Sequence, residues 1–390
     1  MIACKESLAG YRTRSRRMKD RKIILEDGSV YEGYGFGDNS ERILELVFNT
    51  SMVGYQEIIS DPSYTDQAVV MTYPLIGNYG INEDDYETQN PTIGGLVVRE
   101  YNDIPSNFRC THTLDEIMKK HEIVGIYGVD TRQITRKLRD KGSCKAMITD
   151  IERDTKEAVG ILSMVELSHS CVARVSCKSM WKADIIAPFP ENKEMAAGRF
   201  HVVAIDCGMK QNILRSLLAK KCRVTVVPWN TDAATIESLK PDGIFISNGP
   251  GDPEDAVPVI EAVRELKGKY PIFGICLGHQ ILSLAYGART YKLKFGHRGG
   301  NHPVKNLNTG KIEITSQNHS YAVDPESIDS TCLKVTHINL LDNTIEGICC
   351  PQDRAFGVQY HPESCPGPQD SDYLFDEFIA NMKRGGRLHA

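Results

Sequence analysis

The sequence predicts an α/β protein in which a mainly parallel-sheet domain, in the C-terminal half, follows a smaller domain of mixed α and β structure. From residue 200 the chain alternates continuous apolar runs with segments of helical spacing, which is typical of a parallel sheet covered on both faces. Before residue 168 the apolar runs are shorter and turn residues separate them. A chain of 390 residues is also too long for one ordinary core.

We expect four parts along the chain: a disordered extension at 1–21, a mixed α/β domain at 22–167, a linker at 168–199 and the parallel-sheet domain at 200–386. The extension is basic between Tyr11 and Arg17, where a transit-like segment is the alternative, although it lacks a long amphipathic pattern. In the linker, apolar periodicity gives way to Ser, Lys, Pro and Asn.

The composition is that of a soluble globular protein, with 41% hydrophobic residues, 25% charged residues and a net charge of -5. This mild acidity gives no reason to expect nucleic acid or a membrane as a partner. No apolar run approaches the length of a membrane span. Twelve scattered cysteines and no secretory signal favour free thiols in a reducing cytoplasm.

In the first domain, β-type residues on both sides of Asp27-Gly28 predict a hairpin. Residues 51–80 are rich in Tyr, Pro, Gly and Asn, which indicates ordered loops of the kind that often carry function. Further strands are expected at 45–50, 93–98, 123–130 and 144–149, and helices at 113–121, 131–140 and 154–167. By itself this domain shows no group of residues with a catalytic pattern.

The second domain begins with strands that alternate with helices. Strands are expected at 200–206, 222–229, 243–247 and 270–275, with helices at 210–220, 233–239 and 257–266. Shorter β-like runs follow Gly287, and an amphipathic helix is expected at 372–383. Because ligands bind beyond the carboxyl ends of parallel strands, the Gly-rich loop 247–252 and Cys276 are expected on one rim of the sheet.

Cys276 is the strongest candidate for a catalytic nucleophile. It lies between a buried strand and a segment of helical spacing, with Gly274 and Gly278 on either side. Small residues there permit a tight, strained turn and leave space above the thiol, as in a nucleophile elbow. The helix N-terminus favours negative charge and so favours the thiolate. A buried cysteine that only packs is the alternative.

His361 is the candidate base for this cysteine. It follows an apolar strand, and Glu363 lies two residues further on, where a carboxylate can orient an imidazole. Alone, the H-P-E motif would also suit a surface turn, but together with the elbow it predicts a triad. His279, on the helix after Cys276, is the rival and is expected to pack locally. The expected oxyanion hole consists of the backbone N–H groups of Gly249 and Leu277.

We expect no metal site in this chain. Cys171 and Cys177 have no matching pair at ligand spacing. His297 and His302 lie among glycines and basic residues without a nearby carboxylate or thiolate, which favours a binding or interdomain loop.

Three motifs of the second domain, SNGPGDP, GICLGHQ and YHPE, resemble those of class I (triad) glutamine amidotransferases over about residues 200–385. Segments of the whole chain from about Lys22, among them NTSMVGYQEIISDPSYTDQAVVMTYPLIGNYG, VDTRQITRKLR, KFGHRGGNHPV and SQNHSYAVD, are similar to the small, glutamine-hydrolysing subunits of carbamoyl-phosphate synthetases. The resemblance implies that Cys276 attacks glutamine, that His361 acts as base and then acid, and that Glu363 orients His361.

The resemblance also implies a glutamine site that uses both domains. The implied contacts are Ser63, Gly249, Gly251, Leu277, Gln280, Asn318, Ser320 and Tyr321. Ser320 departs from the family, which commonly has Gly there, and the basic segment before Met18 has no counterpart.

The resemblance further implies a large partner subunit that receives ammonia and makes carbamoyl phosphate from bicarbonate, for arginine or pyrimidine synthesis or both. The implied assembly is a heterodimer or a higher oligomer of heterodimers. We expect no cofactor in this chain, and ATP and Mg in the partner. The alternatives are a glutaminase subunit of another amidotransferase and a non-catalytic regulatory subunit.

Overall fold

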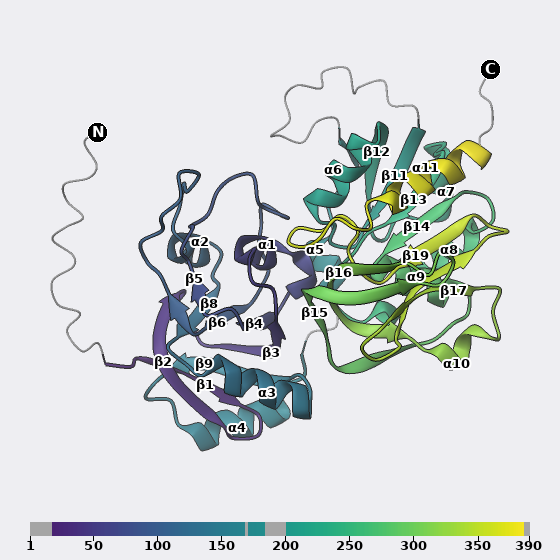
Figure 1. Cartoon of the computed structure of the whole chain (residues 1–390). Helices are drawn as coiled ribbons and strands as arrows, with labels where there is room; N and C mark the ends of the chain where they lie inside the picture. Colours follow the sequence, from purple (N-terminus) through teal and green to yellow (C-terminus); the bar gives the residue numbers. More distant parts are fainter. Residues whose placement is uncertain (1–17, 168–170, 184–199, 386–390) are drawn as a thin grey trace.

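The computed structural model describes residues 18–167, 171–183 and 200–385, and it has two domains that lie side by side (Figure 1). Most of the expected extension at 1–21 and much of the expected linker fall outside the described residues. The α/β fold class predicted from the sequence is confirmed. Among the described residues, no helix combines the length and apolar character that crossing a membrane requires.

The N-terminal domain is a closed barrel whose strands follow the order β1-β2-β8-β6-β4-β3-β9. These strands are β1 (Arg21–Leu25), β2 (Val30–Gly37), β3 (Arg42–Asn49), β4 (Gln67–Met71), β6 (Gly95–Val98), β8 (Val124–Tyr127) and β9 (Cys144–Asp150). A small pair, β5 (Leu75–Ile76) and β7 (Glu100–Tyr101), lies outside the barrel. Closure leaves the barrel without free strand edges.

Helices and loops cover the outside of this barrel. They are α1 (Tyr55–Ser60), the short 3-10 helix at Pro62–Tyr64, α2 (Leu114–Lys120), α3 (Thr131–Lys141) and α4 (Thr155–Met164). Thr113 caps α2: its hydroxyl accepts from the Glu116 N–H, and the Glu116 side chain accepts from the Thr113 N–H. Such a capping box satisfies two orphan donors at once.

The C-terminal domain is built on a ten-stranded sheet in the order β10-β12-β11-β13-β14-β19-β18-β17-β15-β16. The strands are β10 (Trp181–Ala183), β11 (Phe200–Asp206), β12 (Cys222–Pro228), β13 (Gly243–Ile246), β14 (Ile272–Ile275), β15 (Thr290–Asn306), β16 (Ile312–Val323), β17 (Lys334–Asn339), β18 (Ile345–Cys350) and β19 (Ala355–Val358). The run from β12 to β19 is parallel, and the remaining pairs are antiparallel.

Helices pack on both faces of the parallel strands, as their continuous apolar sequences predict. One face carries α6 (Gln211–Ala219) and α11 (Tyr373–Gly385), and the other carries α7 (Ala233–Ser238), α8 (Val257–Leu266) and α9 (Leu277–Ala285). On the first face, the ring of Phe273 stacks on that of Phe356 with centroids 4.4 Å apart. A short α10 (Pro325–Ile328) precedes β17, and a 3-10 helix at Pro253–Asp255 precedes α8.

The segment expected to be only a linker contains regular structure. It includes α5 (Cys171–Val175) and β10, which pairs antiparallel with β12 at the edge of the sheet. Figure 1 shows α5 at the junction of the domains, near α1 and the ends of β15 and β16. The polar composition of this segment concealed the elements because both are short and β10 lies at the edge of the sheet.

Candidate active site

Four neighbouring parallel strands place the candidate catalytic groups on one rim. β11, β13, β14 and β19 pair in that order, so their carboxyl ends lie side by side. Lys210 follows β11, the loop 247–252 follows β13, Cys276 follows β14, and His361 follows β19. The sheet topology therefore brings together residues that are up to 151 positions apart.

Cys276 occupies a strained turn between β14 and α9. Its backbone has φ 53° and ψ −106°, a left-handed conformation that is costly for a residue other than Gly. Close packing explains the flanking glycines: a Cβ on Gly274 would lie 2.4 Å from the Gly278 carbonyl oxygen, and one on Gly278 would lie 2.2 Å from the Ile246 carbonyl oxygen. The observed geometry is that of the predicted nucleophile elbow.

His361 is buried and is oriented by Glu363. Its Nδ1 lies 2.6 Å from Glu363 Oε1, so Nδ1–H donates and Nε2 is the nitrogen left for chemistry. Nε2 makes no hydrogen bond of standard geometry with another described residue. Cys276 nevertheless lies close enough to help raise the pKa of His361. The arrangement holds the imidazole at one nitrogen and directs the other toward the thiol region.

Lys210 is a further charged group in this cluster, and the sequence analysis did not single it out. Its ammonium donates to Glu363 Oε1 at 3.0 Å and to the carbonyl oxygens of Ser364 and Cys365 at 2.8 and 3.0 Å. Lys210 is 3% exposed, and its pKa is raised because Glu363 and other carboxylates outweigh the effect of burial. The sequence signal for Lys210 was its position shortly after the end of a strand, but we assigned Lys210 to the following helix.

The charges of this cluster stabilise one another. Burial alone would lower the pKa of His361, but Glu363 and Cys276 raise it to about 10. Burial alone would raise the pKa of Glu363, but Lys210 and His361 lower it to about 2. Glu363 therefore stays a carboxylate, and the imidazolium form of His361 is favoured.

The groups expected to form the oxyanion hole lie beside the thiol. Leu277 is the first residue of α9, where a backbone N–H has no intrahelical acceptor. Gly249 packs so closely that an added Cβ would lie 2.1 Å from the Cys207 carbonyl oxygen and 2.8 Å from Leu277 Cδ2. Only Gly allows the loop to approach this closely.

The N-terminal domain contributes directly to the same site. Ser63 Oγ accepts a hydrogen bond from Asn248 Nδ2 at 3.0 Å, and Asp61 Oδ2 accepts one from Asn318 Nδ2 at 2.9 Å. All four side chains are buried. The Asn318 carbonyl oxygen in turn lies 3.5 Å from Cys276 Sγ. The site is thus a composite of both domains, and Asp61 is a member that the sequence analysis did not find.

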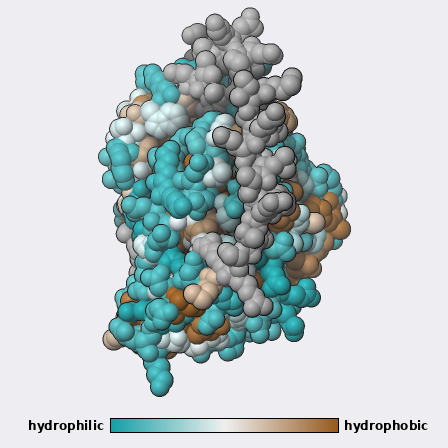
Figure 2. All heavy atoms as spheres, turned by 90° about the vertical axis from the view of Figure 1, so that its left-hand side faces the viewer, coloured by the Kyte–Doolittle hydropathy of each residue, from teal (hydrophilic) through white to brown (hydrophobic). Residues whose placement is uncertain are grey.

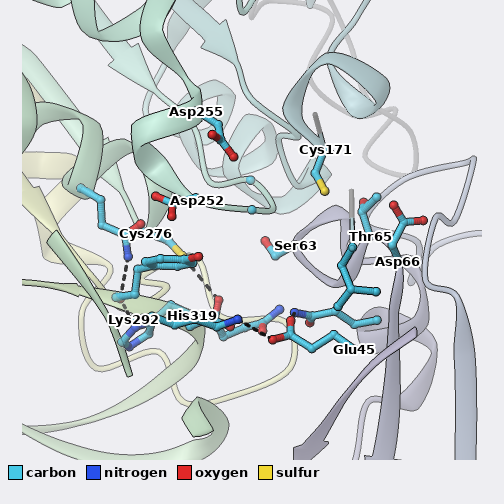
Figure 3. Close-up of a pocket in the computed structure, with 18 of the residues that line it drawn as sticks. Glu45, Ser63, Thr65, Asp66, Cys171, Asp252, Asp255, Cys276, Lys292 and His319 are labelled. Carbon is cyan, nitrogen blue, oxygen red and sulfur yellow. Dashed lines mark hydrogen bonds and ion pairs between the residues drawn. The ribbon is translucent and has the colours of Figure 1, made fainter. Parts of the chain in front are cut away.

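A pocket between the domains opens above Cys276 (Figure 3). All the expected glutamine contacts except Leu277 line this pocket. Leu277 packs next to Gly249 instead. The pocket wall contains positively and negatively charged side chains. Lys292 pairs with Glu45 at 2.8 Å, and Asp252 and Asp255 lie on the opposite side of the pocket. The lining residues that were expected contacts are Ser63, Gly249, Gly251, Gln280, Asn318, Ser320 and Tyr321.

Two of these expected contacts are held by other groups of the protein. The amide nitrogen of Gln280 donates to the Tyr321 carbonyl oxygen at 2.7 Å and to Gln359 Oε1 at 2.9 Å. The hydroxyl of Ser320 accepts from the buried guanidinium of Arg298. Ser320, where the family commonly has Gly, is therefore anchored to a cation of the pocket wall that the sequence analysis did not single out.

His297 and His319 belong to a separate buried network. His297 lies 2.8 Å from Asp342 Oδ2 and 3.0 Å from Gln317 Oε1, and His319 lies 2.7 Å from the Tyr321 carbonyl oxygen. His297, His319 and Glu346 lie close enough to hold a metal ion, but these hydrogen bonds already engage the ring nitrogens. His279 is fully buried against Gly357, and burial lowers its pKa to about 3.

Comparison with known proteins gives two family matches. The model described as "Glutamine amidotransferase class-I" matches residues 203–381, and "Carbamoyl-phosphate synthase small chain, CPSase domain" matches residues 23–148. A "Carbamoyl phosphate synthase small chain" from Fusobacterium nucleatum is 53% identical over 94% of this chain and 99% of its own length. The chain belongs to the carbamoyl phosphate synthase small chain family.

Other members of this family match as fully. The small chain of Oceanobacillus iheyensis is 50% identical over 96% of this chain and 100% of its own length. A "Carbamoyl phosphate synthase pyrimidine-specific small chain" from Halalkalibacterium halodurans is 50% identical over 93% of this chain and 97% of its own. The small-chain family predicted from the motifs is confirmed, and with it the amidotransferase domain.

Proposed function

We propose that this chain hydrolyses L-glutamine to glutamate and ammonia at Cys276 and supplies the ammonia to a large, ATP-using partner chain that forms carbamoyl phosphate. The observation that carries the proposal is the rim cluster of Cys276, His361, Glu363 and Lys210 beneath a pocket that both domains line. The pocket has groups of both charge signs, which suits the zwitterionic end of an amino acid.

In the first half of the reaction, the Cys276 thiolate adds to the amide carbon of glutamine. The N–H groups of Gly249 and Leu277 stabilise the oxyanion of the tetrahedral intermediate. The imidazolium of His361 gives its Nε2 proton to the departing amine, the C–N bond breaks, and ammonia leaves. A γ-glutamyl thioester remains on Cys276.

In the second half, neutral His361 accepts a proton from water while the hydroxide adds to the thioester carbon. The C–S bond then breaks, which returns the thiolate and releases glutamate. Glu363 and Lys210 hold His361 in one orientation throughout. Since Glu363 remains ionised between two cations, it stabilises the imidazolium and takes up no proton.

Ser63 and Asp61 support a substrate role for the N-terminal domain. Both lie in the segment 61–63, which reaches the catalytic domain through Asn248 and Asn318. A domain that completes the pocket wall can make glutamine binding depend on how the two domains pack.

The experiment that tests the proposal measures glutamate release from glutamine by the full chain, alone and with its large partner chain. We expect release in both conditions and faster release in the complex. Trapping with radiolabelled glutamine should leave a base-labile γ-glutamyl adduct on Cys276. No glutamate and no adduct in either condition would contradict the proposal.

A further inference from the structure

Two cysteine thiols outside the candidate active site are in direct contact in the C-terminal domain. Cys332 Sγ lies 3.3 Å from Cys350 Sγ, near α10 and β17 at the right of Figure 1. By contrast, most of the outer face of the N-terminal domain that is visible in Figure 2 is hydrophilic, and its hydrophobic groups are small and separate. A pair of thiols at contact distance is a reactive feature that the proposed hydrolysis of glutamine leaves unused.

Strand pairing brings the two cysteines together. Cys332 lies two residues before β17, and Cys350 is the last residue of β18. The two strands are antiparallel with Lys334 opposite Cys349, so the start of β17 lies beside the end of β18. Because side chains alternate along a strand, Cys350 packs in the core on the α8 and α9 face, whereas Cys349 packs against the core on the α11 face. The contact therefore selects Cys350 over its neighbour.

The loop that carries Cys332 is held by hydrogen bonds. The Thr331 hydroxyl donates to the Ile328 carbonyl oxygen at 2.7 Å and accepts from the Leu333 N–H at 3.1 Å. Leu333 is also buried in the core. Since both neighbours of Cys332 are fixed, its thiol stays beside Cys350. A disulfide has a sulfur–sulfur distance of about 2.05 Å, so the two sulfurs need to approach by only about 1.3 Å.

Exposure assigns the two thiols different roles in an exchange reaction. Cys332 is exposed, whereas Cys350 is 1% exposed. Burial and the neighbouring Cys332 thiol raise the pKa of Cys350 to about 11. The thiolate is the nucleophile in thiol–disulfide exchange, and access limits the reaction. An external disulfide therefore meets Cys332 first, and Cys350 resolves the product.

We propose that Cys332 and Cys350 form a reversible disulfide by exchange with a low-molecular-weight disulfide, and that this cross-link stabilises the C-terminal domain under oxidising conditions. The Cys332 thiolate attacks one sulfur of the external disulfide RSSR, and the first RS⁻ leaves. Cys350 loses its proton, attacks Cys332 Sγ and releases the second RS⁻. The two cysteines together lose two electrons and two protons, and one RSSR becomes two RSH.

The cross-link lies on the framework behind the candidate triad. The Asp353 N–H donates to the Cys350 carbonyl oxygen at 3.2 Å, and Asp353 Oδ2 accepts from the Tyr286 hydroxyl at 2.8 Å. Tyr286 ends α9, which begins directly after Cys276, and β19 leads from this turn toward His361. The disulfide thus braces the remote ends of both elements that carry the candidate nucleophile and base.

The test incubates the full chain with glutathione disulfide, blocks the remaining thiols and digests the protein with trypsin. Mass spectrometry should find peptide 312–334, which contains Cys332, joined to peptide 335–354, which contains Cys349 and Cys350. The melting temperature should rise by about 5 °C, because the cross-link restricts the unfolded chain. Dithiothreitol should reverse both changes.

Three variants identify the pair. Cys332→Ser changes an exposed side chain, and it should abolish both the joined peptides and the rise in melting temperature. Cys350→Ala should do the same. Cys349→Ser is the matched control, because it removes the adjacent thiol on the other face of β18, and it should behave as the wild type does. Oxidation of other cysteines, Cys276 included, affects all of these proteins alike.

Three outcomes would overturn the inference. Joined peptides that persist in Cys350→Ala would assign the link to Cys349. A wild-type chain that carries only glutathione on Cys332 would exclude the internal disulfide. Joined peptides without a rise in melting temperature would remove the stabilising role. None of these measurements depends on glutamine hydrolysis, so a failure of the proposed function is distinguished from a failure of this inference.

Discussion

The two domains contribute to the active site in different ways. In the C-terminal domain, the reactive groups follow adjacent parallel strands, and buried ionic contacts hold them in place. In the N-terminal domain, a short segment after α1 reaches the pocket with neutral and charged hydrogen-bonding groups. Under the proposed function, the C-terminal domain performs the chemistry and the N-terminal domain helps to hold the substrate.

The largest expected effect is in the catalytic domain, from Cys276→Ser. Without the thiolate, glutamine-dependent synthesis by the complex should fall by at least about 10³-fold, because no thioester forms. Synthesis from added ammonia should remain close to the wild-type rate. Parallel rate measurements with glutamine and with ammonium salts check this, and loss of both activities would assign Cys276 a structural role.

Lys210→Met should be the next most damaging change. It leaves the fully buried Glu363 without its ammonium partner, and breaking a buried pair costs roughly 3–5 kcal/mol. Denaturant unfolding should show this loss together with a lower kcat for glutamine hydrolysis. Lys220→Met is the matched control, since Lys220 pairs with the exposed carboxylates of Asp372 and Asp376 and should cost at most about 1 kcal/mol. Equal losses in the two variants would contradict the role of Lys210.

The charge of His361 predicts a pH dependence of stability. Its folded-state pKa of about 10 lies above its ordinary value of 6.5, so its contribution is fully present below pH 6.5 and is lost as the pH rises through 10. The melting temperature of the wild type should therefore fall more steeply between pH 6.5 and 10 than that of His361→Asn. Parallel curves for the two proteins would refute the raised pKa.

The smallest effect is expected in the N-terminal domain, from Ser63→Ala. Loss of the hydroxyl leaves Asn248 without its acceptor and should lower kcat/KM for glutamine about 10-fold, mainly through KM. Steady-state kinetics check this, with Ser163→Ala on the exposed face of α4 as the control. A fall in kcat at unchanged KM would place Ser63 in the chemistry and would remove the proposed division between the domains.

The local sequence determined much of this protein. Continuous apolar strands predicted the parallel sheet, because strands buried on both faces exclude polar residues. The glycines around Cys276 predicted the elbow, since each feature of that turn lies within a few residues. His361 and Glu363 are only two positions apart, so the sequence alone predicted their contact.

Only the tertiary structure decided which distant groups complete the site. Lys210 meets Glu363 across 153 positions, and Asp61 meets Asn318 across 257. No local pattern specifies such pairs, because strand order and domain packing determine them and periodicity does not. The contact between Ser320 and Arg298 was hidden for the same reason. The short β10 was hidden instead by the polar composition of its segment. The sequence thus indicated the candidate nucleophile and its candidate base, whereas the packing of two domains determined the charges and contacts around them.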